Sequence, residues 1–294
     1  MKTRIFLGIC VSALFLLSGC GGKNPFGIEE IVQESESAYT CTYDGVKHDY
    51  ILDLPEATKN APLVVMLHGY GNTAESFRSM VHFEDDAVPC GYGVVYVTGA
   101  PAPNDATAST GWNSGLGNEG NKDVDFLVEL TKYLQREYGF DKKRTFAVGF
   151  SNGGFMTHRL AMEAADTYTA AVSVAGMMPQ QIWENANGQN DISFFQITGE
   201  KDDVVPKDRD GSAKFAKSPA IETVMEYLAE SAGLTEVETA EIGKASELLK
   251  YTKAGDKKQV WHLWVKDGRH SWPDEAITGI DVNALILEFL DTQK

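Results

Sequence analysis

The sequence predicts an α/β fold in which a mostly parallel β-sheet is covered by helices on both faces. The first observation is that several short segments, such as residues 61–71 and 92–101, are apolar runs that lead into glycine. Runs of this kind are typical of strands buried on both sides, because half-exposed strands alternate apolar with polar residues. The second observation is that these runs alternate along the chain with amphipathic segments of helical length. Such alternation is typical of parallel sheets, whose crossover connections place helices on both faces.

The elements are predicted in order along the chain. Residues 40–54 alternate around Asp44-Gly45, a turn pair typical of a β-hairpin. Residues 122–140 form an amphipathic helix that ends at Gly139. Its apolar face is made by Val124, Leu127, Leu130 or Thr131, Leu134 and Tyr138. The other strands are predicted at residues 61–71, 92–101, 144–150, 168–176, 193–202, 247–253 and 258–268, and the other helices at residues 152–165, 220–233 and 282–293.

The N-terminal segment predicts export. Lys2 and Arg4 precede an apolar run at residues 5–17, and small residues follow it, which is the pattern of a secretory signal peptide. The run is too short to span a bilayer. Leu-Ser-Gly-Cys at its end resembles a bacterial lipobox, in which the cysteine, here Cys20, is lipidated; an ordinary signal with an incidental cysteine is the alternative. The predicted organisation is a lipoprotein-type signal peptide at residues 1–19, a polar tether at residues 20–39 and a single α/β domain at residues 40–294.

This organisation places the protein in the bacterial cell envelope, lipid-anchored at a membrane surface or secreted, with the anchor as its only membrane contact. The chain has 26 basic and 42 acidic side chains, and the signal segment holds two of the basic ones, so the net charge changes from −16 to −18 on cleavage. Such an acidic surface repels phosphate backbones, which makes nucleic acid an unsuitable partner.

Cys41 and Cys90 are the cysteines left after the signal peptide and Cys20 are set aside. Export permits a disulfide between them, but the sequence leaves open whether they pair. The chain has no Cys/His cluster with the spacing of a metal site, and neither a metal nor an organic cofactor is expected.

The candidate nucleophile is Ser151 in the sequence Gly-Phe-Ser-Asn-Gly, which fits the pattern G-x-S-x-G. This pattern places a serine on a sharp turn between a strand and a helix, where flanking glycines avoid clashes and the hydroxyl is exposed. The pattern alone is weak, because short motifs also occur by chance. A strand is predicted directly before Ser151 and a helix directly after it, as the turn requires. A solvated serine in a tight turn is the alternative.

A serine nucleophile needs a basic histidine and an acid that orients it, in the chain order Ser, acid, His. His262 and His270 are the histidines that follow a suitable acid, and His270 is favoured because it lies in a loop after a strand, where open α/β sheets carry their chemistry. His262 lies within a predicted strand. Glu200, Asp202 and Asp203 all follow the strand at residues 193–202, and the pattern does not choose among them.

An oxyanion site needs two backbone N–H groups. The residue after the nucleophile, Asn152, begins a helix and is one candidate. The second is Tyr70 in His68-Gly69-Tyr70-Gly71, where glycines after an early strand let the backbone approach a substrate. His68 itself is expected to be a packed, hydrogen-bonded residue.

Five stretches together resemble one family. LHGYGNTAESF, GWNS with DVDFL, GFSNGGFM with AVSVAG, TGEKDDVVP, and DGRHSWPD occur in the order found in the polyhydroxybutyrate depolymerase and feruloyl esterase group, the α/β hydrolases similar to carbohydrate esterase family 1. The resemblance spans residues 42–290. It implies an α/β-hydrolase fold, Ser151 as nucleophile, Asp202 as acid, His270 as base, and the backbones of Tyr70 and Asn152 as oxyanion donors.

The resemblance also implies that Trp112 and Trp272 lie near the substrate, although both could equally be core residues. Members often have Gly-Gly-Gly-His before Trp-Pro, where this chain has Asp-Gly-Arg-His, so Arg269 adds a bulky cation beside the base. Polymer-degrading members often carry an added substrate-binding domain, and none is recognised here, which argues against activity on solid polyester.

The predicted function is a serine carboxylic ester hydrolase that removes feruloyl or acetyl groups from a plant polysaccharide or oligosaccharide. The alternatives are a polyhydroxyalkanoate or short-chain polyester depolymerase, a serine peptidase on the same fold, and a lipoprotein that retains the fold for binding alone. The last is disfavoured because Ser151, Asp202 and His270 are all present.

Overall fold

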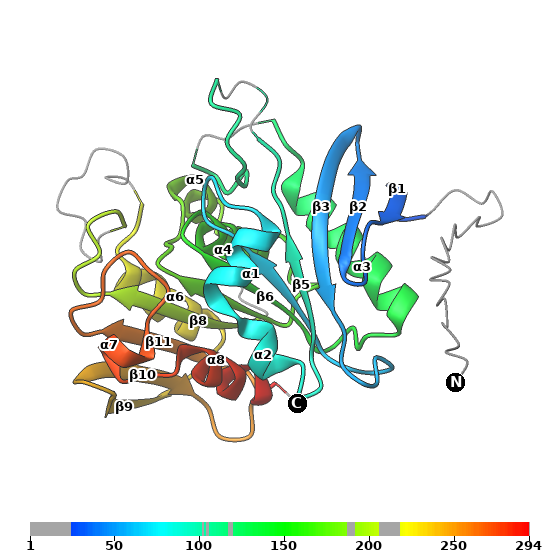
Figure 1. Ribbon diagram of the computed structural model, residues 1–294. Coiled ribbons are helices and arrows are strands. Elements are labelled where there is room, and N and C mark those ends of the chain that lie inside the picture. The colour runs from blue at the N-terminus through cyan, green and yellow to red at the C-terminus, as the bar shows by residue number, and fades with distance from the viewer. Residues whose placement is uncertain are drawn as a thin grey trace, which may run out of the picture.

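The computed structural model describes residues 25–101, 103, 106–116, 120–186, 192–205 and 218–293. Its centre is an eleven-stranded sheet in the order β1-β2-β3-β5-β4-β6-β7-β8-β11-β10-β9, with helices on both faces (Figure 1). The strands from β5 to β11 in this order are parallel, and antiparallel strands extend the sheet at both ends. The predicted fold class is therefore confirmed.

The strands and helices have the following bounds. The strands are β1 (Ile28–Gln33), β2 (Ala38–Tyr43), β3 (Val46–Asp53), β4 (Leu63–Leu67), β5 (Gly93–Val97), β6 (Thr145–Phe150), β7 (Ala170–Val174), β8 (Ser193–Gly199), β9 (Glu236–Ile242), β10 (Ser246–Thr252) and β11 (Val260–Val265). The helices are α1 (Ala74–Val81), α2 (Phe83–Ala87), α3 (Asp123–Tyr138), α4 (Asn152–Glu163), α5 (Gln180–Glu184), α6 (Ile221–Ser231), α7 (Glu275–Thr278) and α8 (Val282–Asp291).

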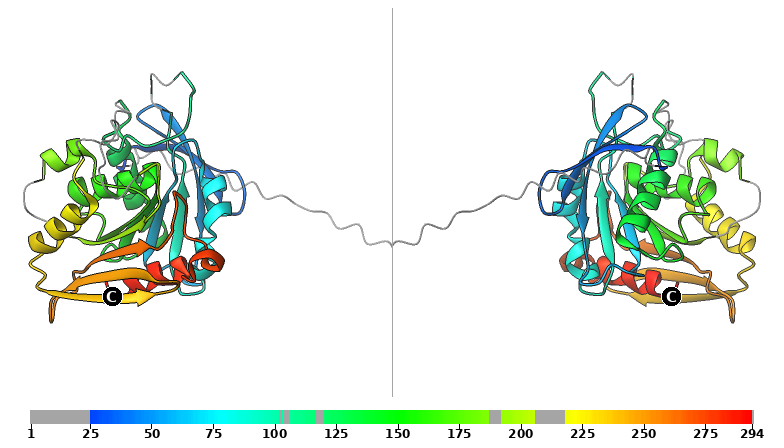
Figure 2. Two further views of the ribbon diagram at one scale, coloured as in Figure 1. Left: turned by 90° about the vertical axis from the view of Figure 1, so that its left-hand side faces the viewer. Right: turned by 90° about the vertical axis from the view of Figure 1, so that its right-hand side faces the viewer.

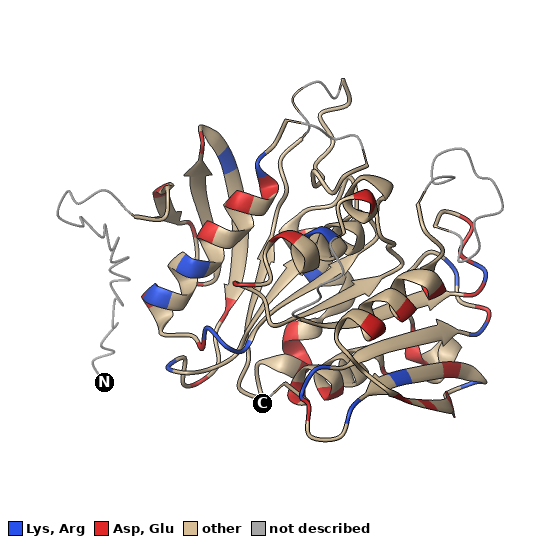
Figure 3. Ribbon diagram, turned by 180° about the vertical axis from the view of Figure 1, so that it is seen from behind, with Lys and Arg blue, Asp and Glu red and all other residues tan. Residues whose placement is uncertain are grey.

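The central strands separate two apolar layers. Alternate residues of a strand point to opposite faces, so Val64 and Met66 of β4 pack with α1, α2 and α8, whereas Leu63 and Val65 pack with α3 and α4. Figure 2 shows these helix layers on the two sides of the sheet. Charged side chains gather on helices, loops and outer strands, and β4 to β8 carry none (Figure 3). This burial on both faces explains the continuous apolar runs in the sequence.

The structure corrects the predicted start of the domain. Residues 28–33, expected within the tether, form β1, which pairs with β2 and buries Ile28. The hydrophobic side chain of Ile28 packs on the layer that holds α3, so this part of the segment belongs to the sheet. The sequence analysis also missed β9, which pairs with β10 at the opposite edge. The predicted signal peptide and Cys20 lie outside the described residues.

Cys41 is buried in β2 and Cys90 is exposed, and both are free thiols, so the two do not form a disulfide. In the part of the chain that the structure describes, no helix is both long and apolar enough to cross a bilayer.

The strand order reverses around β4, because the chain runs from β4 to β5 on one side and later returns to β6 on the other. At such a switch point the loops after the two central strands diverge and leave a crevice. The loop with Tyr70 follows β4 and the turn with Ser151 follows β6, so the topology brings these two predicted elements together. The loops after β8 and β11 carry Asp202 and His270 at the same end of the sheet.

Candidate active site

Ser151 occupies a strained turn between β6 and α4. Its φ of 51° and ψ of −116° lie in a region that residues other than glycine rarely adopt, at a cost of about 1–3 kcal/mol. The N–H group of Ser151 donates to Val174 O at 2.9 Å, which ties the turn to β7. A Cβ at Gly149 would lie 2.2 Å from Gly153 O, and one at Gly153 would lie 2.0 Å from Leu67 O. Only glycines therefore allow β4, β6 and α4 to approach so closely around the serine.

His270 lies within hydrogen-bond distance of this serine. Its Nε2 is 2.8 Å from Ser151 Oγ, and its side chain is 16% exposed. His270 belongs to the loop between β11 and α7, as the sequence predicted. His262, the less favoured histidine, is buried within β11 beside the ring of Trp264.

Asp202 completes a row of three side chains. Its Oδ2 lies 2.8 Å from His270 Nδ1, and its side chain has no exposed surface. Its Oδ1 accepts from the N–H groups of Val204 at 2.9 Å and Val205 at 2.8 Å. Because the carboxylate can only accept, Nδ1 of His270 carries the proton and Nε2 is left to accept from the serine hydroxyl.

The other two candidate acids point elsewhere. Lys266 Nζ donates to Glu200, and this contact lowers the pKa of the partly exposed Glu200 carboxyl. Asp203 is exposed to solvent. Of the three carboxylates that the pattern left open, the structure bonds Asp202 to His270.

Backbone hydrogen bonds join the turn after β8, which carries Asp202, to the loop between β11 and α7. This loop carries His270 and is called here the base loop. The N–H of Glu200 donates to Val265 O at 3.0 Å, and that of Lys201 donates to Gly268 O at 2.7 Å. A Cβ at Gly199 would lie 2.6 Å from Gly268 O, so the two segments are as close as glycines permit. The distance between Asp202 and His270 is thus set by main-chain contacts between the residues that directly precede them.

The chain segments that carry the two predicted oxyanion donors both lie beside Ser151. Asn152 is the first residue of α4, where the N–H group has no partner within the helix. A Cβ at Gly69 would lie 3.4 Å from Ser151 Cβ, which places the segment that carries Tyr70 beside the nucleophile. The side chain of Asn152 is used structurally, because its Oδ1 accepts from Trp112 N at 2.7 Å.

The structure separates the two tryptophans. Trp112 is fully buried, and its Nε1 donates to His68 O at 2.9 Å, so its side chain offers no surface to a substrate. The prediction that Trp112 contacts the substrate is therefore wrong, because the whole ring is packed beneath the loop that follows β4. Trp272 is half-buried, donates to Asn283 Oδ1 at 3.1 Å and lines a cavity next to His270.

His68 is held as a neutral, packed side chain. Its Nε2 accepts from Gly99 N at 2.9 Å, and its Nδ1 therefore donates to Gly69 O at 2.7 Å. Burial lowers the pKa of His68 to about 4. A histidine that is neutral and bonded at both nitrogens fixes the loop that carries Tyr70.

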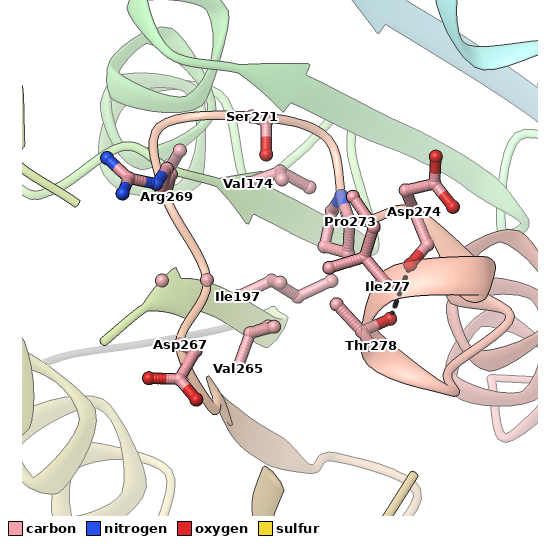
Figure 4. Close-up of a pocket in the computed structure, with 13 residues that line it drawn as sticks. Val174, Ile197, Val265, Asp267, Arg269, Ser271, Pro273, Asp274, Ile277 and Thr278 are labelled. Atoms are coloured by element: carbon pink, nitrogen blue, oxygen red, sulfur yellow. Dashed lines mark hydrogen bonds between the residues drawn. The ribbon is translucent and has the colours of Figure 1, made fainter. Parts of the chain in front are cut away.

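Two cavities adjoin the loop between β11 and α7, and both include Ser271, Pro273 and Asp274 in their walls. The larger, of about 590 Å³, includes His270, Phe150 and Trp272 in its wall. The smaller, of about 180 Å³, lies between the loop and the ends of β7, β8 and β11, with Val174, Ile197, Val265 and Ile277 in its wall (Figure 4). In the same view the guanidinium of Arg269 points away from Ser271, so this cation is not directed across the smaller cavity.

Sequence reasoning missed most of the residues that form these walls. Met80 and Ile277 are exposed apolar side chains, and Asp281 and Asn283 come from the start of the last helix and the residue before it. No motif marks them, because their role depends on which distant loops meet over His270. Among the described residues, one group of three potential metal ligands converges, His82, Glu84 and Asp85, and Glu84 is already bonded to Tyr96 and Arg78.

Comparisons with known proteins show that the chain is similar to esterases. Residues 54–231 match the family model described as phospholipase/carboxylesterase. The chain is 25% identical over 213 residues to feruloyl esterase D of Neurospora crassa. This match covers 69% of this chain and 70% of that protein. It is 27% identical over 146 residues to a bifunctional acetylxylan esterase/xylanase of Neocallimastix patriciarum. This second match covers 50% of this chain but only 20% of that protein.

A solved structure, an acetyl xylan esterase from Aspergillus awamori, superimposes with a TM-score of 0.59. The match covers 83% of this chain and 94% of the other, at 12% sequence identity, and therefore supports the fold. The resemblance to the polyhydroxybutyrate depolymerase and feruloyl esterase group that the motifs suggested is confirmed, because feruloyl and acetylxylan esterases are among the similar proteins.

Proposed function

The chain belongs to the phospholipase/carboxylesterase family of α/β hydrolases, and from this premise we propose that it is an exported serine carboxylic ester hydrolase that removes feruloyl or acetyl groups from plant polysaccharide. The observation that carries the proposal is the row of hydrogen bonds from Asp202 through His270 to Ser151, with both links at 2.8 Å. A serine bonded to a basic histidine that is itself oriented by a carboxylate is the arrangement that activates a hydroxyl for acyl transfer.

The proposed reaction uses these groups in sequence. His270 Nε2 takes the proton of Ser151 Oγ as the oxygen attacks the ester carbonyl carbon, and Asp202 stabilises the imidazolium. The N–H groups of Tyr70 and Asn152 donate to the oxyanion, each contributing about 2.7–4 kcal/mol to the lowering of the barrier. His270 then gives its proton to the leaving alcohol, which separates from the acyl-enzyme. Water, deprotonated by His270, finally releases the acid and restores Ser151.

The substrate class is supported by the relatives and by the site. The relatives in the comparison include a feruloyl esterase and an acetylxylan esterase, both named for esters found on plant polysaccharide. The cavity beside His270, at about 590 Å³, lies in the usual range for sites that hold a small organic group. The scheme requires no metal or organic cofactor, because the acid, base and oxyanion donors all come from the chain.

The N-terminal pattern supports the location. A cleaved signal at residues 1–19 and a lipid on Cys20 would hold the enzyme at the outside of a membrane. Esterified plant polysaccharide is too large to enter a cell, so an enzyme that acts on it has to be exported. Radiolabelled palmitate incorporated into the parent and not into a Cys20→Ala variant tests the anchor. Equal labelling of the two proteins would contradict it.

The activity is tested by release of ferulate from methyl ferulate and feruloylated arabinoxylan, and of acetate from acetylated xylan. A Ser151→Ala variant provides the blank, and a fluorophosphonate probe followed by peptide mass spectrometry identifies the labelled residue. We expect release by the parent alone and labelling at Ser151. Full activity in the variant would refute the mechanism. Cleavage of p-nitrophenyl acetate without release from either polysaccharide would instead move the substrate to short-chain esters or polyesters.

A further inference from the structure

The cavity beside His270, called here the base-side cavity, is built from four parts of the chain. They are the end of α1, a residue of α2, the end of β6, and the segment from the base loop to the start of α8. Its lining residues are Met80, Val81, Asp86, Phe150, His270, Ser271, Trp272, Pro273, Asp274, Glu275, Ile280, Asp281, Val282 and Asn283. His270 is part of this wall and is not among the residues that line the smaller cavity.

The charges in this wall have one sign. Four lining residues carry carboxylates, namely Asp86, Asp274, Glu275 and Asp281, and no lysine or arginine is among the lining residues. Three of the four are held in place by hydrogen bonds. Asp274 accepts from Ala276 N at the start of α7, Asp281 accepts from Ala284 N at the start of α8, and Asp86 accepts from Asn283 Nδ2. The negative field is therefore a fixed property of the cavity.

The same wall also offers apolar and aromatic surface. Trp272 is half-buried, with its indole N–H bonded to Asn283 and its ring in an edge-to-face contact with Phe77, so the orientation of its ring is fixed. Met80 exposes 43% of its surface beside it. A fixed aromatic ring next to hydrogen-bond acceptors suits a sugar, whose C–H groups pack on a ring while its hydroxyls donate to carboxylates. An anionic group in the same place would meet four like charges.

The position of His270 decides which part of the ester enters this cavity. The base must give its proton to the leaving alcohol, so the alcohol oxygen has to lie within hydrogen-bond reach of Nε2. The wall that contains His270 is therefore where the alcohol portion extends.

We propose that the base-side cavity binds the alcohol portion of the ester as an uncharged polyol, and that its four carboxylates reject alcohols that carry a carboxylate or phosphate. The proposal rests on the proposed esterase function and adds to it a discrimination by charge. Neutral pentose or hexose units are favoured over uronic acid units at this position.

The test compares two esters that differ by one charge. Caffeoylquinic acid and its methyl ester have the same acyl group and nearly the same alcohol, but only the first carries a carboxylate on the alcohol portion. We expect kcat/KM of the parent to be on the order of tenfold higher for the methyl ester, the size of effect that several carboxylates roughly 8–10 Å away produce in a solvent-accessible site. The ratio should fall as salt concentration rises, because ions screen the cavity charges.

A double variant, Asp86→Asn with Glu275→Gln, removes two of the four charges while keeping the side-chain sizes. A second double variant, Glu29→Gln with Glu137→Gln, changes the net charge equally on β1 and α3, at the other end of the sheet. We expect the ratio to fall about threefold in the first protein and to keep the parent value in the second. Equal kcat/KM for the two esters in the parent, or equal changes in both variants, would overturn the proposal while leaving the esterase function intact. Hydrolysis of neither ester, with acetate still released from acetylated xylan, would overturn this proposal and leave the esterase function intact. Loss of that acetate release as well would overturn the proposed function.

Discussion

Replacing Asp202 by asparagine should abolish most activity without disturbing the fold. The Asp202 side chain accepts on both oxygens, from two backbone N–H groups through Oδ1 and from His270 Nδ1 through Oδ2. Asparagine has one acceptor and one NH₂ donor in the same shape. If its oxygen keeps the backbone contacts at Val204 and Val205, its NH₂ faces His270, which then has to accept at Nδ1.

That exchange reverses the tautomer of His270. With the proton on Nε2, the ring donates toward Ser151 Oγ and can no longer take the serine proton. The opposite amide orientation places the NH₂ group against two backbone N–H donors inside a site with no exposed surface, which is unfavourable. Loss of the correct tautomer typically lowers kcat about 10⁴-fold, or about 5.4 kcal/mol in the activation free energy.

The assay is kcat for p-nitrophenyl acetate and methyl ferulate, measured for the parent, Asp202→Asn and Asp203→Asn. The neighbouring Asp203 is exposed, so its asparagine variant carries the same change in charge without touching His270. We expect Asp203→Asn to stay within about twofold of the parent. If Asp202→Asn kept more than a tenth of the parent kcat while urea unfolding showed a normal fold, the assignment of Asp202 as the orienting acid would be wrong.

The remaining predictions concern residues around the site. Trp112→Phe should lose about 1–2 kcal/mol of unfolding free energy in urea, because it breaks a buried hydrogen bond, and should leave KM nearly unchanged. Trp272→Ala should raise KM and also lower the unfolding free energy, because it removes ring packing on Phe77 and the bond to Asn283. A raised KM in Trp112→Phe, or an unchanged KM in Trp272→Ala, would contradict the burial argument. Because the pKa of folded His68 is lowered to about 4, the unfolded state binds more protons than the folded state between about pH 6.5 and 4. This difference lowers the free energy of unfolding as pH falls through that window. Urea unfolding at pH 7 and 4.5 should show a smaller loss in His68→Asn than in the parent, and equal losses would refute this.

Much of the fold could be predicted because burial on both faces leaves a simple signature. β4 reads Leu-Val-Val-Met-Leu, and every residue of it is buried, so its apolar run is visible without any alignment. β1 lacked that signature, because Ile28 is its one buried residue and the other five are exposed or half-exposed, as in a linker. β9 was missed for the same reason, since it is an edge strand whose residues are mostly exposed and include three glutamates. Edge strands depend on pairing with a neighbour, which the local sequence does not record.

One part of the candidate site depends on neighbouring residues in the sequence, and another part depends on contacts between distant loops. Ser151 was predictable because the glycines that its turn needs are its sequence neighbours, and a Cβ at Gly153 would fall within 2.0 Å of Leu67 O. The local pattern could not choose among Glu200, Asp202 and Asp203, and only the family resemblance pointed to Asp202. All three are carboxylates on one turn, and the path of a loop some 65 residues later in the chain decides which one meets His270. That path is set by the clamp between Lys201 N and Gly268 O, which turns Asp202 inward and leaves Glu200 to pair with Lys266 on the surface. The clamp uses backbone atoms, whose positions no side-chain pattern encodes, so the identity of the acid is a property of the fold and that of the serine a property of its immediate sequence.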